Sequence, residues 1–156
     1  MLRRWRVKRS GSTYKLNLPG PEREVILVLC GQLKELVSTP PDAHDDRMTR
    51  LFPTAYADDP ERDAEYRRYM HDELVTSRLA SIEMVEETVE MSEVSESQLM
   101  GWMRAVNSIR LVLGTLLDVS EETDVADIDD DHPDVGHYAL YAYLSALLEE
   151  IVAALG

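Results

Sequence analysis

Residues 95–117 read SESQLMGWMRAVNSIRLVLGTLL, and this stretch decides the fold class. Its apolar side chains recur at spacings of three and four residues, which is the periodicity of one face of an α-helix. They are Leu99, Trp102, Met103, Val106, Ile109, Leu113, Leu116 and Leu117. Ser95 and Gln98 match a capping box, in which each side chain satisfies a backbone N–H at a helix start. The stretch predicts a helix over residues 97–117.

Three further segments show helical periodicity and predict helices over residues 22–37, 60–89 and 134–155. The second of these follows Asp59-Pro60, an N-cap residue with proline at the first helical position. Strands and helices do not alternate along the chain, which argues against an α/β sheet. We therefore expect a mainly α protein, a bundle of four principal helices.

Two of these helices carry more apolar surface than one packed face needs. In residues 22–37, Ile26 and Val28 widen a stripe, so we expect this helix to be buried on more than one side. That stripe consists of Val25, Leu29, Leu33 and Leu36. Residues 134–155 have little polar face, which is typical of a central helix or of half of a dimer interface. A homodimer through this last helix is one prediction.

The positive charge of the chain is concentrated at its start. Residues 1–15 hold 6 basic side chains and no acid, whereas the other 141 residues hold 10 basic and all 30 acidic ones. The start therefore sums to +6 and the rest to −20. Within residues 1–18, alternating side chains on both sides of Ser10-Gly11-Ser12 predict a β-hairpin. Because two strands alone are marginally stable, this hairpin must pack on the helices.

The basic hairpin is the first candidate contact surface. So unequal a charge distribution is more typical of a regulator or contact protein than of a small-molecule enzyme. We predict that Arg3, Arg4, Trp5 and Arg6 bind a protein partner. The net charge of −14 disfavours nucleic-acid binding by the rest of the chain. Contact of the hairpin with nucleic acid would be weak and nonspecific at most.

Asn107 and Arg110 are the second candidate site, three residues apart beside the apolar stripe of residues 97–117. A charge at the edge of a core needs a partner, because a buried unpaired charge is costly. We predict that Arg110 pairs with an acid of residues 60–89 or of the Asp58-Asp59 corner. The alternative is that Asn107 and Arg110 mark a partner-binding groove.

Cys30 is the only cysteine, so no disulfide can form within the chain and a thiolate metal cluster is not expected. It ends the apolar run of residues 25–30, which favours a buried hydrophobic role. The alternative is an exposed, redox-sensitive thiol that oxidises or pairs between chains.

Motifs for other chemistries are missing from the sequence. No nucleophile elbow, phosphate-binding loop or pair of Glu-x-x-His steps occurs, and the acid-rich residues 118–133 lack the pattern of a calcium loop. We expect no metal and no cofactor, and not an enzyme; a catalytic or ligand-binding helical bundle is the alternative. Without a signal peptide or an apolar run of about 20 residues, we expect a cytoplasmic location and no membrane contact.

The polar residues 38–49 and 118–133 are predicted loops between the helices of a single domain, residues 1–156. Phe52, the only phenylalanine, is expected to anchor the first of these loops to the core.

Two stretches of the chain resemble the signature of an actinobacterial family known as a domain of unknown function. They are RLFPTAY at residues 50–56, followed by Asp58-Asp59-Pro60, and SQLMGWMRAVNSIRLVLG at residues 97–114. With the acidic connector and the Tyr-rich last helix, the resemblance covers nearly the whole chain. It implies a cytosolic regulator that acts through protein contacts, and some members are described as oxidative-stress transcriptional regulators working with an alternative sigma factor.

A redox regulator that switches by an internal disulfide needs two thiols, and this chain has one. The thiol switch does not carry over from the resemblance. Redox sensing would have to run through Cys30, as a sulfenate or an interchain bond.

Overall fold

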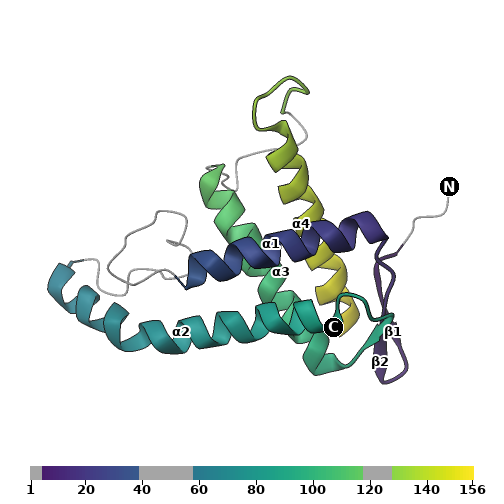
Figure 1. Ribbon diagram of the computed structural model, residues 1–156, viewed down its shortest axis with the longest axis horizontal. Coiled ribbons are helices and arrows are strands. Elements are labelled where there is room, and N and C mark those ends of the chain that lie inside the picture. Colours follow the sequence, from purple (N-terminus) through teal and green to yellow (C-terminus); the bar gives the residue numbers. More distant parts are fainter. Residues whose placement is uncertain (1–4, 39–57, 118–127) are drawn as a thin grey trace.

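The computed structural model describes residues 5–38, 58–117 and 128–156, apart from the side chains of residues 67–72. The fold is mainly α with an N-terminal hairpin, as predicted (Figure 1). The helices begin and end within two residues of the predicted ranges. The elements are β1 (Val7–Ser10), β2 (Thr13–Leu16), α1 (Gly20–Val37), α2 (Pro60–Thr88), β3 (Glu93–Val94), α3 (Glu96–Leu116) and α4 (Val135–Leu155).

Most of the two predicted loops, together with Phe52 and its predicted anchoring role, lies outside the described residues. The described end of the second loop, from Ile128, is a turn that leads into α4.

The hairpin is part of a three-stranded antiparallel sheet with the order β1-β2-β3. Gly11 in its turn has a φ of 65°, a conformation that residues with a Cβ rarely adopt. The sequence did not predict β3, because a strand of two residues is too short to show an alternating pattern. Through Val94, which pairs with Tyr14, this strand joins the hairpin to the α2–α3 connection.

The predicted helix starts are confirmed. The Asp59 side chain accepts a hydrogen bond from the backbone N–H of Arg62 at 3.2 Å. At α3 the N–H of Gln98 donates to Ser95 Oγ at 3.2 Å, and the N–H of Ser95 donates to Gln98 Oε1 at 2.8 Å. These bonds satisfy donors that a helix cannot pair internally, so the sequence sets both start positions.

The core is organised around α3, which packs on both α2 and α4. Its Trp102 is fully buried, and the indole N–H donates to Thr88 Oγ1 of α2 at 2.7 Å. Thr88 in turn donates to the carbonyl of Met84 at 2.6 Å. One residue before the indole, a Cβ added to Gly101 would lie 2.7 Å from Met84 Cγ. The two helices therefore approach closely at a glycine, and a hydrogen-bond chain fixes their register.

α1 is buried on one side, and the prediction that it is buried on more than one is wrong. Ile26, Cys30 and Val37 are core residues, whereas Val25 is 43% exposed and Val28 59% exposed. The physical reason is the position of α1, which crosses the outside of the bundle (Figure 1). Its second apolar side is left uncovered.

α4 is also peripheral, and its contacts run to α3 and β1. Leu144, Leu147 and Ile151 face the core, whereas its far side is exposed and rich in alanine. The exposed alanines are Ala139, Ala142, Ala146 and Ala153. Since α4 is not central, the homodimer through this helix stays a prediction.

In the part of the chain that the structure describes, α4 is the one helix long and apolar enough to cross a membrane. Only 17% of its most apolar window is buried. Core helices of soluble proteins pass the same test, and α4 gives Leu144, Leu147 and Ile151 to the core. Length and composition alone therefore carry no membrane assignment.

Thr88→Val tests the hydrogen bond at the centre of the core. Valine keeps the shape of threonine but leaves the buried indole N–H of Trp102 without an acceptor, so we expect a loss of about 1–3 kcal/mol in the free energy of unfolding. Urea denaturation monitored by circular dichroism measures it. Thr115→Val is the matched control, because the Thr115 hydroxyl donates only to the carbonyl of Leu111 in its own helix. Equal losses in both variants would contradict the role of the indole bond.

Candidate protein-contact surface on the basic hairpin

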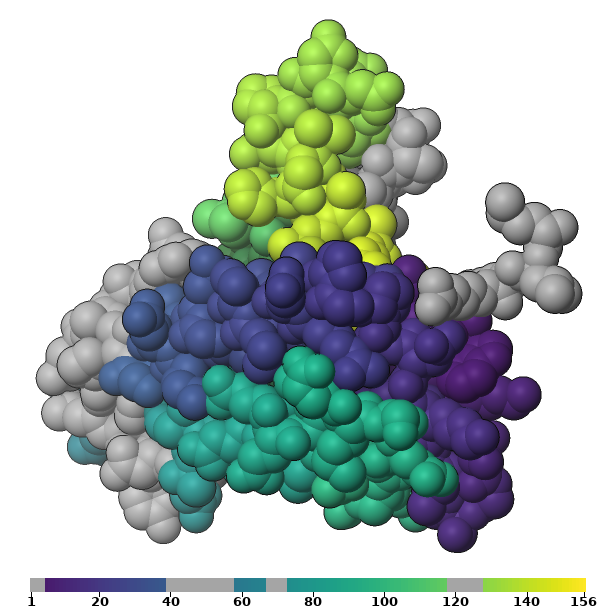
Figure 2. All heavy atoms as spheres, turned by 45° about the vertical axis from the view of Figure 1, so that its right-hand side comes forward, coloured from purple at the N-terminus to yellow at the C-terminus, as the bar shows by residue number. Residues whose placement is uncertain are grey.

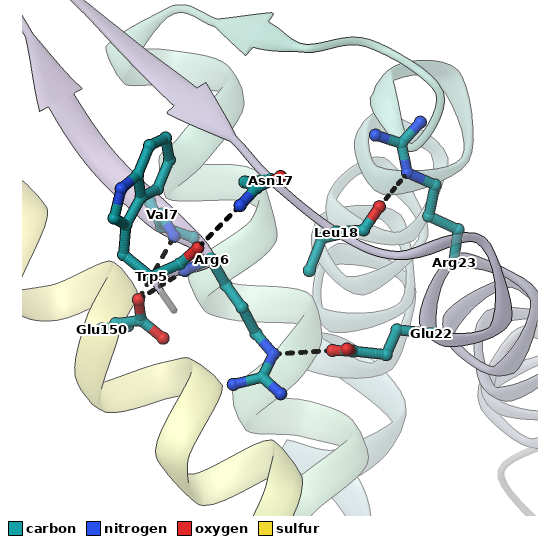
Figure 3. A network of polar contacts seen from close by, with 8 residues as sticks. All are labelled: Trp5, Arg6, Val7, Asn17, Leu18, Glu22, Arg23 and Glu150. Atoms are coloured by element: carbon teal, nitrogen blue, oxygen red, sulfur yellow. Dashed lines mark hydrogen bonds and ion pairs between the residues drawn. The ribbon is translucent and has the colours of Figure 1, made fainter. Parts of the chain in front are cut away.

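The hairpin is fixed to the C-terminal helix by one carboxylate. Glu150 of α4 accepts hydrogen bonds from the backbone N–H groups of Arg6, at 2.6 Å, and Val7, at 3.4 Å (Figure 3). The inner side of the hairpin is part of the core, where Val7, Tyr14 and Leu16 are at most 5% exposed. Backbone bonds and apolar burial together orient the sheet, so its outer side faces away from the helices.

Arg6 is engaged within the chain. Its Nε donates to Glu22 Oε1 of α1 at 2.6 Å, and the guanidinium lies 5.1 Å from the ring centroid of Tyr143 on α4. The hydrogen bond to Glu22 raises the pKa of Arg6, and burial raises the pKa of Tyr143. Arg6 therefore joins β1 to α1 and α4 (Figure 3). Its predicted contact with a partner stays a prediction.

Trp5 lies at the surface beside the first strand. Its carbonyl accepts a hydrogen bond from Asn17 Nδ2 at 3.2 Å, and its side chain is 37% exposed. Lys8 Nζ lies 5.7 Å from the Trp5 ring centroid, a cation–π distance. Arg3 and Arg4 lie outside the described residues, so the structure places only half of the four predicted contact residues.

Lys8 and Lys15 stand directly opposite each other on β1 and β2, and both are exposed. Like charges in this position destabilise a strand pair. Glu93, which pairs with Lys15 on β3, brings an acid next to Lys15, and its carboxylate accepts a hydrogen bond from the Thr13 hydroxyl. We call Trp5, Lys8 and Lys15 the hairpin face. A carboxylate or phosphate bound here would relieve the repulsion between the two lysines.

Arg9 belongs to the other side of the strand and lies 5.8 Å from the Tyr14 ring centroid, at the edge of the core. The sequence alone did not separate Lys8 and Lys15 from Arg6 and Arg9. Alternation along a strand gives the side of each residue, but the register between strands decides which cations face one another.

Asn107 and Arg110 form a cluster with α4. Arg110 Nη2 donates to Asn107 Oδ1 at 3.1 Å, Nη1 donates to Tyr141 Oη at 3.4 Å, and the guanidinium lies 5.9 Å from the Tyr141 ring centroid. The predicted pairing of Arg110 with an acid of α2 or of the Asp58-Asp59 corner is not found among the described residues. The hydroxyl and amide oxygens take the place of the expected carboxylate, because Arg110 faces α4 and not α2.

The sequence did not single out Arg78 of α2. Its Nη1 donates to Ser108 Oγ at 3.3 Å, and burial lowers its pKa. The Nε atoms of Arg78 and Arg110 are both buried, and neither has a hydrogen-bond partner among the described residues. A small polar residue such as Ser108 inside an apolar helix stripe was the available signal, because it leaves room for a long side chain from a neighbouring helix.

Cys30 is fully buried on the core side of α1, which confirms the expectation of a hydrophobic role. Burial raises its pKa to about 12, so the thiol stays protonated at neutral pH. The thiolate is the form that oxidises or attacks a disulfide. Cys30 is therefore not an exposed thiol, and its redox sensitivity stays a prediction.

Acidic side chains are abundant, but the described ranges contain no group of three or more His, Cys, Asp or Glu residues placed to hold a metal ion. Fold and surface together define a small helical protein with an outward-facing basic sheet.

The chain belongs to the family described as "Domain of unknown function (DUF2017)", whose model matches residues 2–155. It is 28% identical over 120 residues to proteins named "Oxidative stress regulator AosR" from Mycobacterium bovis and Mycobacterium tuberculosis. The match covers 74% of this chain and 52% of the relatives, so the chain spans about half the length of the curated relatives it matches. No solved structure matches the chain.

Glu150→Ala tests the attachment of the hairpin. Removing the carboxylate leaves two part-buried N–H groups without their acceptor, so we expect the free energy of unfolding to fall by about 1–3 kcal/mol. Glu149→Ala is the control, because Glu149 is exposed on the same helix and we expect a change within about 0.5 kcal/mol. Thermal and urea unfolding of both variants measure the difference. A loss of similar size in both would contradict the attachment.

The thiol of Cys30 should react with Ellman's reagent at least about 100-fold more slowly in the folded protein than in urea at pH 8, because it is buried and protonated. Since the folded pKa is raised and the unfolded thiol ionises near pH 8.5, its contribution to stability is present at neutral pH and falls as the pH rises towards 12. The absorbance of the coloured product of Ellman's reagent, followed over time, gives the reaction rates in the folded protein and in urea. Rapid modification of the native protein would contradict the assignment of Cys30 as a buried, protonated thiol.

Proposed function

We propose that this chain is a regulatory protein of the oxidative-stress response that acts by binding another protein, and that it is not an enzyme. The name of the mycobacterial relatives supports a regulatory role. Because the chain spans about half of their length, their activity is carried over here only as a proposal. The mode of action rests on the surface of this chain itself.

The observation that carries the proposal is the hairpin face. Two lysines stand opposite each other next to an exposed indole, on a chain whose net charge is −14. Tryptophan is among the residues that contribute most to interfaces, and clustered cations steer association with an acidic partner. The face therefore fits an acidic protein surface with an apolar spot beside it.

The partner that we propose belongs to the transcription machinery, as an alternative sigma factor in the cytoplasm would. The support is the resemblance of the two signature stretches to stress regulators of that kind. Six basic side chains on a short hairpin support contact with phosphates and not base-specific readout, so direct nucleic-acid binding through the hairpin would be weak and salt-sensitive.

The redox signal would reach this chain through its partner or through a segment beyond these 156 residues. Within them there is one cysteine, and it is buried with a raised pKa. An internal disulfide needs two thiols, and a rapid sulfenate needs an accessible thiolate.

Lys8→Glu tests the hairpin face without weakening the fold. Glutamate opposite Lys15 replaces a like-charge pair by an opposite-charge pair, so we expect the free energy of unfolding to stay or to rise by about 0.2–1 kcal/mol. Capture of the partner should fall about fivefold or more. The measurement is binding of purified sigma factors of the source organism to the immobilised chain, followed by quantitative capture from nuclease-treated cytosol.

Arg104→Glu is the matched control, because Arg104 is exposed on α3 and the substitution changes the net charge equally. Binding should survive this change. Equal losses in both variants would show that net charge, and not the hairpin face, governs binding, and unchanged capture with Lys8→Glu would contradict the proposal. Deletion of residues 1–18 is unsuitable here, since it removes Val7, Tyr14 and Leu16 from the core.

A further inference from the structure

The uncovered side of α1 is one wall of a groove that the hairpin does not touch. The groove has a volume of about 930 Å³ and runs between α1, α3 and α4. Most of its lining is apolar, with Val25 and Val28 from α1, Ile109 and Leu116 from α3, and Leu140 from α4. We call it the helical groove.

The side chains along the helical groove are unusually exposed for their type. Val28 is 59% exposed, Leu116 57% and Val25 43%, and the three come from two helices that converge on one hollow. In Figure 2 the N-terminal part of α4 stands clear of α1, which leaves the corner between them open. Contiguous exposed apolar surface of this kind marks an interaction site more often than scattered single residues do.

The shape of the helical groove argues against a second copy as its occupant. In a two-fold dimer the hollow of one copy is filled only if the same patch of the other copy also carries a convex element. The convex alanine face of α4 does not help, because at 100° per residue Ala142 and Ala146 lie on the far side of that helix from Leu140. A single convex element, such as a helix, fills a hollow of this kind.

The charge of the residues that line the helical groove indicates the charge of the partner that it would bind. Its polar lining residues are Glu24, Gln32, Glu35 and His137, with no lysine or arginine among the lining residues that the structure describes. The two basic residues of α1 face away: Arg23 Nη1 lies 3.4 Å from Glu90, and Lys34 Nζ lies 2.6 Å from Glu86.

We propose that the helical groove binds an amphipathic helix of a partner protein, with large apolar side chains inserted between α1 and α3 and with Lys or Arg along its edges. Apolar anchors at positions i, i+3, i+4 and i+7 match such a groove, and the basic flanks match its acidic rim. Asn107 lies on the opposite side of α3, 180° from Leu116 at 100° per residue. Asn107 and Arg110, which the sequence offers as an alternative partner-binding groove, do not line the helical groove.

The test uses a fluorescein-labelled peptide of about 18 residues, with leucines along one helical face and lysines elsewhere. Fluorescence anisotropy against the full chain gives Kd for this peptide. Two control peptides have glutamate in place of lysine, or the same composition with leucines spread around the helix. We expect the first peptide to bind at least about tenfold more tightly than either control.

Variants of the chain then locate the peptide. Val28→Glu and Leu116→Glu each place a charge in the groove, and we expect the Kd to rise about tenfold or more. Val152→Glu is the matched control, because Val152 is 50% exposed on α4 and does not line the groove. Its Kd should stay within about twofold. If Val152→Glu and Val28→Glu changed the Kd equally, the peptide would be bound by the overall charge of the chain and not in the groove, and the proposal would be overturned.

Two further outcomes would also overturn the assigned occupant. If sedimentation shows a dimer of the free chain that Val28→Glu dissociates, the occupant is a second copy. If Val28→Glu strongly lowers the melting temperature of the free chain, the groove is covered by the chain itself. A result at Lys8 does not bear on this test, since the hairpin face lies outside the groove.

Discussion

The contact of Trp102 with Thr88 constrains the rest of the structure. The indole is fully buried, and its one polar atom has to find an acceptor inside the core, which only a register that brings Thr88 opposite it provides. Gly101, next to the indole, lets Met84 approach α3 to a distance that a Cβ would forbid. With α2 and α3 fixed in this way, α3 presents one side to α4 and another to α1, and the positions of the outer helices follow.

The acidic helices take up part of the positive charge of the hairpin and leave the rest outside. Glu22 and Glu150 hold Arg6 and the start of β1, while Lys8 and Lys15 face away from every helix. Arg6 and Lys8 are two residues apart, so alternation along a strand does not separate them. Arg6 stands just before β1, where Glu22 and Glu150 bond to it, whereas Lys8 lies within the strand and is exposed. The positive charge at the start of the sequence is therefore found in part on the hairpin face, the surface that we propose binds an acidic partner.

The apolar surplus of α1 divides in a similar way. Ile26 and Cys30 fill the core, and Val25 and Val28 form the wall of a groove. Among the described residues, the other three helices and the small sheet do not surround α1, because it crosses the outside of the bundle. Surface of this kind costs solubility unless something covers it, which is why a helix with two apolar sides points to a partner when the domain covers only one.

The sequence by itself determined the mainly α class, the helices α1 to α4 among the described residues, the capped starts of α2 and α3, the hairpin and the burial of Cys30. These features depend on periodicity and on side chains that bond within three residues, as Ser95 and Gln98 do. Only the tertiary structure decided the strand β3, the opposition of Lys8 and Lys15, the engagement of Arg6, the tyrosine partner of Arg110 and the open side of α1. Each depends on which segments distant in the chain lie against each other, and local spacing holds no information about that register.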